Sequence, residues 1–224
     1  METLELEMKK TAENKVENIS GSEAVLKALI EESVTTVFGY PGGAIMPIYD
    51  ALFDYDGHLN HILVRHEQGA IHAAQGYART SGDVGVVFAT SGPGATNLVT
   101  GLADAQIDST PVVAITGQVF AHLLGTDAFQ ETDVINITTP VTKWNYQVTD
   151  ATEIPAVLAK AFYIAKSGRP GPVLIDITKN AQLQKFDYKG YEKCTHIRSY
   201  RPKPIIRKTF VEEAAKLINE AKKP

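Results

Sequence analysis

The chain has 224 residues and a formal net charge of -4, with 44% hydrophobic and 21% charged residues. These values are typical of a soluble globular protein, and the scattered Lys and Arg residues exclude a nucleic-acid-binding surface. No stretch approaches the roughly 18 uninterrupted apolar residues that cross a membrane, and the polar start does not resemble a secretion signal. We therefore expect a cytoplasmic protein. Cys194 is the only cysteine, which excludes an intrachain disulfide and a cysteine-based metal site.

The first third of the chain predicts alternating helices and strands. Ser20 and Glu23 have the spacing of a capping box, and apolar residues at helical spacing follow them. Thr35 to Tyr40 is a short run rich in β-formers, and the turn at Pro41-Gly42-Gly43 leads into a helix over 44–53. Residues 60–65 predict the next strand, and 67–80 carry apolar residues on one face of a helix.

Three apolar runs indicate the centre of a sheet. Residues 84–89, 111–116 and 172–177 are almost wholly apolar, as parallel strands covered on both faces are. We expect helices over 95–105 and 151–166. The alternation predicts an α/β fold, a doubly wound and mostly parallel sheet with helices on both faces. The long segment 117–133 between elements is typical of a functional loop.

The remaining segments suggest the domain organisation. We expect a flexible leader over 1–17, a domain over 18–185, and an extension over 186–224. The extension combines a polar linker draped over a surface with an amphipathic helix over 211–221. An α/β pattern would next supply a strand, so the chain looks cut at the beginning of a further domain.

Glu67 and the turn from Thr90 to Asn97 are the most informative features. Each follows a predicted strand, so both should face the carboxyl edge of the sheet, where α/β proteins bind cofactors. A carboxyl group held there out of water can share a proton with a ligand nitrogen. Glu67 could also be a surface carboxylate that favours a helix N-terminus. The turn could be only a tight turn in which Pro93 starts a helix.

The loop at 125–131 has a similar pair of interpretations. It could face a ligand, or it could be a plain connection in which Phe129 anchors the core. The common catalytic motifs are absent: Glu67 has no second histidine at zinc-protease spacing, and Gly92-Pro93-Gly94 lacks the third glycine of a dinucleotide site. The nucleotide P-loop and the nucleophile elbow around Ser91 are also missing.

Taken together, these segments resemble the thiamine-diphosphate-dependent enzymes, most closely the N-terminal domain of acetolactate synthase catalytic subunits. Each motif is weak alone, but their order makes chance an unconvincing explanation. Residues 120 and 122, here Phe and His, depart from the proline and basic residue of many members. The matching segments are 38–44, 66–69, 76–79, 90–97 with 101–105, 114–119, 125–131 and 168–172.

The resemblance implies roles for individual residues. Glu67 would bond to N1′ of the cofactor's aminopyrimidine and act catalytically together with Gln130, which would face the reacting substrate. Arg169 would contact FAD. The remaining residues would surround the pyrimidine (Tyr40, Pro41, Thr90, Pro93, Asn97) or the substrate and its access path (Gly42, Phe129, Lys179).

The resemblance further implies the reaction and the partners. Pyruvate would be decarboxylated and joined to a second small 2-oxo acid, pyruvate or 2-oxobutyrate, on the way to branched-chain amino acids such as valine and isoleucine. Thiamine diphosphate, Mg²⁺ and FAD would be the cofactors, and no metal ligands are predicted in this chain because the family's diphosphate and Mg²⁺ motifs are missing. We expect a homodimer or tetramer, a regulatory small subunit, and a fragment that is inactive alone.

Two alternatives to this function remain at the level of sequence. The chain could be the pyrimidine-binding subunit of another thiamine-diphosphate 2-oxo acid decarboxylase, although its tail after Lys179 argues against a self-contained subunit. It could also be a non-catalytic interaction module in which Glu67 is merely structural.

Overall fold

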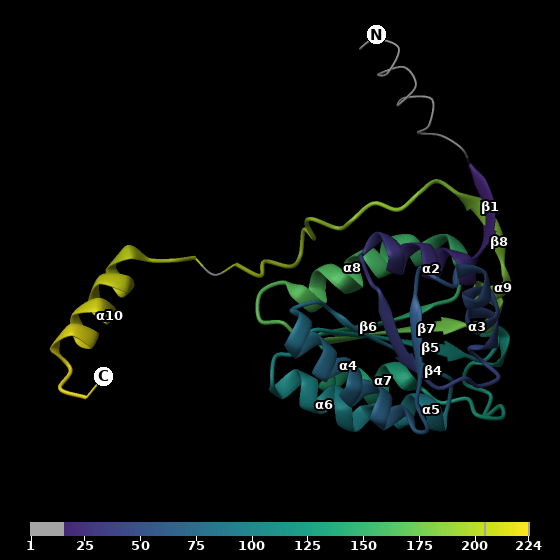
Figure 1. Cartoon of the computed structure of the whole chain (residues 1–224), viewed down its shortest axis with the longest axis horizontal. Helices are drawn as coiled ribbons and strands as arrows, with labels where there is room; N and C mark the ends of the chain where they lie inside the picture. Colours follow the sequence, from purple (N-terminus) through teal and green to yellow (C-terminus); the bar gives the residue numbers. More distant parts are fainter. Residues whose placement is uncertain (1–15, 204, 224) are drawn as a thin grey trace, which may run out of the picture.

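The computed structural model describes residues 16–203 and 205–223, and a six-stranded parallel sheet forms its centre. The strand order is β3-β2-β4-β5-β7-β6. Its strands are β3 (Asn60–Leu63), β2 (Thr36–Gly39), β4 (Gly85–Ala89), β5 (Val112–Gln118), β7 (Pro172–Thr178) and β6 (Trp144–Val148). Helices cover both faces of this sheet (Figure 1). The predicted doubly wound α/β fold is therefore confirmed.

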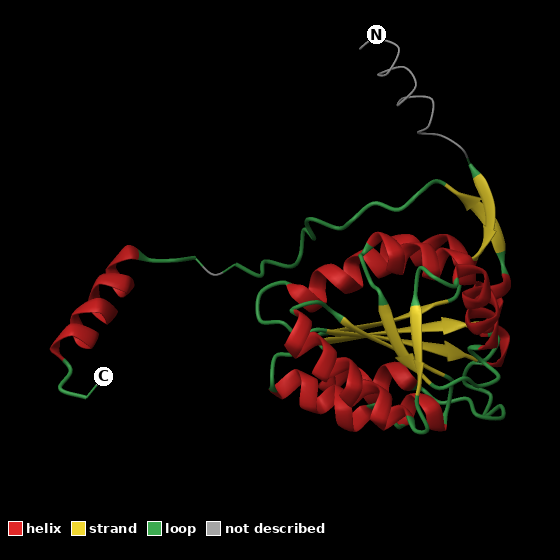
Figure 2. Ribbon diagram, in the orientation of Figure 1, coloured by secondary structure: helices red, strands yellow, loops and turns green. Residues whose placement is uncertain are grey.

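Each face of the sheet has its own apolar core. One core packs α2 (Gly21–Glu31), α3 (Met46–Leu52) and α8 (Ile154–Lys166) against residues such as Phe88. The other packs α4 (Glu67–Ser81), α6 (Val99–Ile107) and α7 (Val134–Thr138) against the opposite face. Figure 2 shows the sheet between these two layers. Neighbouring residues of one strand point into different cores, because side chains alternate along a strand.

The first helix begins where the sequence predicts. Ser20 caps α2: its hydroxyl oxygen accepts a hydrogen bond from the backbone N–H of Glu23. The Glu23 carboxylate in turn accepts one from the backbone N–H of Ser20 at 2.7 Å. Both halves of the capping box are present, and they satisfy two amide groups that a helix start otherwise leaves unpaired.

The structure corrects several predicted boundaries. The single helix predicted over 95–105 is two, α5 (Pro93–Thr96) and α6, separated at Asn97-Leu98. The strand β6 and the helix α7 were missed entirely. An apolar run does not mark β6, because polar Asn145 and Gln147 interrupt it and only Val148 is buried.

The ends of the predicted domain also differ from expectation. Residues 1–15 of the predicted leader lie outside the described residues, but Glu17 begins strand β1 (Glu17–Ser20). This strand pairs antiparallel with β8 (Lys185–Tyr188), so the predicted boundary at 185 falls inside a strand. The two strands form a ribbon beside the main sheet (Figure 1). Between β7 and β8 the chain forms the short helix α9 (Lys179–Leu183).

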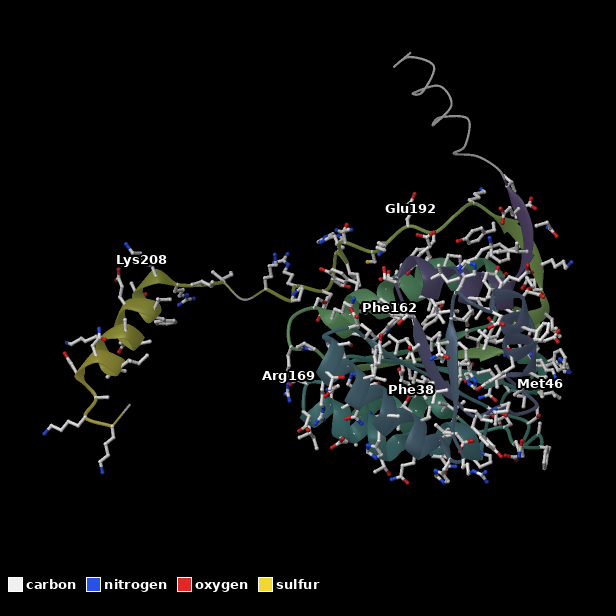
Figure 3. The ribbon with its side chains drawn as sticks, viewed as in Figure 1. Phe38, Met46, Phe162, Arg169, Glu192 and Lys208 are labelled. Atoms are coloured by element: carbon white, nitrogen blue, oxygen red, sulfur yellow. The ribbon has the colours of Figure 1, made fainter. Side chains whose placement is uncertain are left out.

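The segment after β8 lies along the surface, as expected, and specific contacts hold it there. The Tyr191 hydroxyl donates to the Glu32 carboxylate at 2.8 Å, and the Tyr200 hydroxyl donates to the carbonyl of Ser167 at 3.0 Å. The chain then reaches α10 (Lys208–Glu220), whose side chains are all exposed. In Figure 3 this helix, marked by Lys208, stands apart from the α/β unit. No helix in the described residues is long and apolar enough to cross a membrane.

Candidate active site at the carboxyl edge of the sheet

The turns after β2 and β4 meet where the chain changes direction across the sheet. From β2 the chain moves outward to β3 and then returns past β2 to form β4. Loops at such a switch point diverge and leave a crevice at the carboxyl ends of the strands. The Thr90 hydroxyl accepts a hydrogen bond from the backbone N–H of Ala44 at 3.2 Å, which joins the two turns directly.

Glu67 lies at this edge and is buried, with only 7% of its surface exposed. It is the first residue of α4, where His66 caps the helix by accepting from the N–H of Gln68. One carboxylate oxygen, Oε2, accepts a hydrogen bond from the Asn97 side-chain amide at 2.9 Å. Within the described part of the chain, no group donates to the other oxygen, Oε1. The interpretation of Glu67 as an ordinary surface carboxylate is therefore wrong.

Gly94 packs closely against both Thr90 and Glu67. A Cβ atom at this position would lie 2.7 Å from Cγ2 of Thr90 and 3.2 Å from Oε1 of Glu67. Gly42 is similarly close, because its Cβ would lie 2.5 Å from Cβ of Thr90. Glycine at both positions lets the two turns pack closely around Thr90 and brings the backbone of the second turn beside the Glu67 carboxyl.

The remaining residues predicted around the pyrimidine lie on the same two turns. Tyr40 follows β2 directly, has 41% of its surface exposed, and donates its backbone N–H to Phe88. Pro41 is half-buried, and Pro93 is exposed and starts α5, as the plain interpretation of the turn also predicted. The structure thus brings together Tyr40, Pro41, Thr90, Pro93 and Asn97 with Glu67 at one edge of the sheet.

The residues predicted to face the substrate come from two further segments. The Lys179 ammonium group donates to the carbonyl of Gly43 at 3.1 Å, which places it beside the turn after β2. The backbone of Gln130 packs against Gly92, where a Cβ would lie 2.7 Å from the Gln130 carbonyl oxygen. Phe129 has 88% of its surface exposed, so the alternative that it anchors the core is wrong.

Arg169 is not part of this cluster. It precedes β7 and therefore lies at the amino ends of the strands, far from Met46 at the opposite end in Figure 3. Its guanidinium donates to the carbonyls of Gln106 and Ile107 and to the Ser109 hydroxyl, at 3.2, 2.7 and 2.7 Å. These contacts bind the last turn of α6, where unpaired carbonyls attract a cation.

Sequence reasoning missed a buried polar cluster beside the site. Asp176 of β7 is fully buried and accepts from the Thr116 hydroxyl at 2.6 Å and from the amides of Gln118 and Gln147 at 3.1 and 2.9 Å. Burial raises the pKa of this carboxyl, and the three hydrogen bonds oppose the rise. The signal in the sequence was a charged residue within an otherwise apolar strand.

Comparisons with known proteins agree with this geometry. The sequence profile described as "Thiamine pyrophosphate enzyme, N-terminal TPP binding domain" matches residues 19–137, more than half of the chain. The chain therefore belongs to this family, whose fold and cofactor class are those that the sequence predicts. The domain supports binding of thiamine diphosphate, the compound that the profile names as thiamine pyrophosphate.

Individual relatives show which enzymes of this family the chain is similar to. The chain is 54% identical over 208 residues to an acetolactate synthase large subunit of Corynebacterium glutamicum, an alignment covering 93% of this chain and 33% of that protein. It is 55% identical over 209 residues to the acetolactate synthase large subunit IlvB1 of Mycobacterium tuberculosis, covering 93% and 34%. For an acetolactate synthase large subunit of Pyropia yezoensis the identity is 50% over 208 residues, covering 92% and 35%. The chain spans about a third of the length of these relatives.

Proposed function

We propose that this chain forms the pyrimidine-binding part of an acetolactate synthase. The single observation that carries the proposal is the buried Glu67 carboxyl, which is held by Asn97 on one oxygen and keeps the other directed along the bare backbone of Gly94. The identity of 50 to 55% to acetolactate synthases over almost the whole chain supports the choice of enzyme.

The residues at the sheet edge fit an aminopyrimidine. The ring would lie beside Oε1 of Glu67, at the edge where the turns that carry Gly42 and Gly94 pack closely on Thr90. A carboxyl oxygen without an internal partner can bond to a ring nitrogen and hold a proton there. Asn97 keeps the carboxyl oriented, since its amide donates to the other oxygen.

The proposed reaction makes use of this placement. Thiamine diphosphate, when bound, supplies the electron sink for breaking the bond between a carbonyl carbon and a carboxylate. Glu67 would hold the proton at the ring nitrogen, and burial keeps water away from it. Gln130 and Lys179, on two sides of the same edge, would face the 2-oxo acid and its carboxylate. The substrates proposed are pyruvate and a second 2-oxo acid, pyruvate or 2-oxobutyrate.

The proposal extends to cofactors and partners of the whole enzyme. We assign Mg²⁺ to the diphosphate of the cofactor, FAD to the side of Arg169, and branched-chain amino acid biosynthesis as the pathway. A homodimer or tetramer is supported by exposed apolar side chains near the candidate site, among them Met46 and Leu63, which are 50% and 65% exposed. A regulatory small subunit and a cytoplasmic location complete the proposal.

A chimeric enzyme tests the function. Residues 18–223 replace the aligned segment of the Corynebacterium glutamicum large subunit, and acetolactate formation from pyruvate is measured. The chimera should be active, and Glu67→Gln should lower kcat by about 10²- to 10⁴-fold, the range for loss of a general acid or base. Glu31→Gln, which removes an equal charge at an exposed residue of α2, should leave kcat unchanged.

Two outcomes would contradict the proposal. A chimera that folds, as judged by circular dichroism, but retains full activity with Glu67→Gln would remove Glu67 from the reaction. A chimera that decarboxylates pyruvate without forming acetolactate would favour the other class, a simple 2-oxo acid decarboxylase.

A further inference from the structure

One buried amide touches both ends of the loop that carries Phe129 and Gln130. Gln118 is the last residue of β5 and is fully buried. Its carbonyl oxygen Oε1 accepts from the backbone N–H of Val119 at 2.9 Å, where the loop begins. Its amide nitrogen Nε2 donates to the carbonyl of Thr132 at 3.0 Å, where the loop ends.

Asp176 determines which way this amide points. The second hydrogen of the Gln118 amide is donated to Oδ2 of Asp176 at 3.1 Å. A flipped amide would put its carbonyl oxygen against two acceptors, Thr132 and Asp176, and its NH₂ group against the N–H of Val119. Because all three contacts would become repulsive, the carboxyl of Asp176 and the Thr132 carbonyl fix one orientation.

The middle of the loop depends on its ends. Within the described chain, the hydrogen bonds of residues 123–131 stay inside the loop, for example from the N–H of Glu131 to the carbonyl of Ala128 at 2.9 Å. Asp127 and Gln130 adopt the left-handed backbone conformation, with φ of 55° and 58°. Residues other than glycine rarely adopt this conformation. Gln130 nevertheless sits against Gly92 of the turn that reaches Glu67.

The two ends of the loop have different further anchors: the end continues into α7, where the N–H of the buried Val134 donates to the Thr132 carbonyl at 2.8 Å, and the beginning is held by the segment after β7. The N–H of Ala121 donates to the Asn180 side chain at 2.8 Å, and the N–H of Lys179 donates to the carbonyl of Val119 at 3.3 Å. Among the described residues, only Gln118 ties Thr132 back to the sheet through a hydrogen bond. Loss of this amide should therefore release the second half of the loop more than the first.

We infer that Gln118 is a positioning residue that clamps the two ends of loop 119–132 and, oriented by Asp176, holds Gln130 against the turn of the active site. The clamp itself is a property of the fold. Its consequence for catalysis rests on the proposed function: a released loop would present Gln130 to the 2-oxo acid in many positions, while Glu67, Thr90 and Asn97 would remain in place for the cofactor.

Hydrogen exchange followed by mass spectrometry tests the clamp on the chain itself. Gln118→Met keeps the length of the side chain and removes its polar atoms. Exchange over residues 124–132 should become about tenfold faster, the factor that loss of one buried hydrogen bond carries. The matched control is Gln147→Met, because Gln147 donates to the same Asp176 oxygen without touching the loop. Among the described residues, the Gln147 side chain makes no hydrogen bond to the loop, so this control should leave exchange in the loop unchanged.

The chimeric enzyme supplies the second readout. Gln118→Met should lower kcat/KM for pyruvate about tenfold without changing the thiamine diphosphate concentration that gives half-maximal activity, and Gln147→Met should change neither. An inactive chimera would refute the proposed function and leave the exchange result intact, so the two ideas fail separately.

The inference is refuted if hydrogen exchange over residues 124–132 is the same in Gln118→Met and Gln147→Met. It is also refuted if Gln118→Met accelerates exchange in β4 and β5 as much as in the loop. If Gln118→Met does not fold, Gln118→Asn replaces it. Asparagine keeps a polar group but is too short to reach Val119 and Thr132 together, so the same acceleration over 124–132 is expected.

Discussion

The crowding around Gly94 predicts that a single added methyl group destabilises the candidate site. In Gly94→Ala the new Cβ would lie 2.7 Å from Cγ2 of Thr90, whereas ordinary carbon contacts are roughly 3.5 to 4 Å. Thr90 must therefore move, and overpacking of this kind costs about 1–3 kcal/mol. The alanine also favours the helix by about 0.5–1 kcal/mol. The free energy of unfolding should therefore fall by about 0 to 2.5 kcal/mol.

A control and a rescue variant separate these two effects. Gly76→Ala lies in α4, where a Cβ meets no atom within 4 Å, so it should stabilise the protein by about 0.5–1 kcal/mol. Thr90→Ser removes Cγ2 and keeps the hydroxyl that accepts from Ala44. The double variant Thr90→Ser/Gly94→Ala should recover most of the free energy of unfolding that Gly94→Ala loses. Urea unfolding measures all four variants. If Gly94→Ala stabilises as much as Gly76→Ala, the tight contact with Thr90 does not exist.

Three further predictions concern the fold. Ser20→Ala removes the capping box of α2 and should lower the free energy of unfolding by about 1 kcal/mol in urea titrations, whereas Ser20→Asp should retain most of it. Phe162→Ala leaves a cavity at a fully buried position of α8 and should lower the free energy of unfolding by about 3–5 kcal/mol. A far smaller decrease, measured by thermal unfolding, would contradict this prediction. Burial raises the pKa of Asp176 above its ordinary value of 3.8, so its contribution to stability is complete below that value and is lost as the pH rises through the folded pKa. Asp176→Asn lacks this titration: the free energy of unfolding of the variant relative to the parent should therefore increase from pH 3.5 to 7, and a constant difference would show that the pKa of Asp176 is not raised in the folded protein.

The central strands and the edge residues were predictable because both depend on local patterns. The apolar runs that form β4, β5 and β7 can be buried only on both faces, and this requires helices on both sides. Thr90 follows β4 directly and Glu67 begins the helix after β3, so a parallel sheet places both at one edge whatever the details of packing. The capping box of α2 is equally local, since it involves residues three apart.

The unpredicted features depend on contacts between distant segments. Strand β8 is short, and its partner β1 lies 165 or more residues earlier in the chain. Asp176 is a charged residue within an apolar strand, but its partner Gln118 is identified only once β5 and β7 are known to be neighbours. Arg169 carries a motif of the family, but its bonds to α6 appear only when the helix end is in place.

The β1–β8 ribbon has a mechanical consequence. Because Glu17 pairs with Tyr188, the first strand and the strand that leads into the surface segment lie side by side and run in opposite directions. Tension on the two flanking segments would first break the contacts of Tyr200 with Ser167 and of Tyr191 with Glu32, and would then open this ribbon one pair of residues at a time, before any load reached the parallel strands. The unit that carries Glu67 is thereby shielded from strain transmitted along the polypeptide.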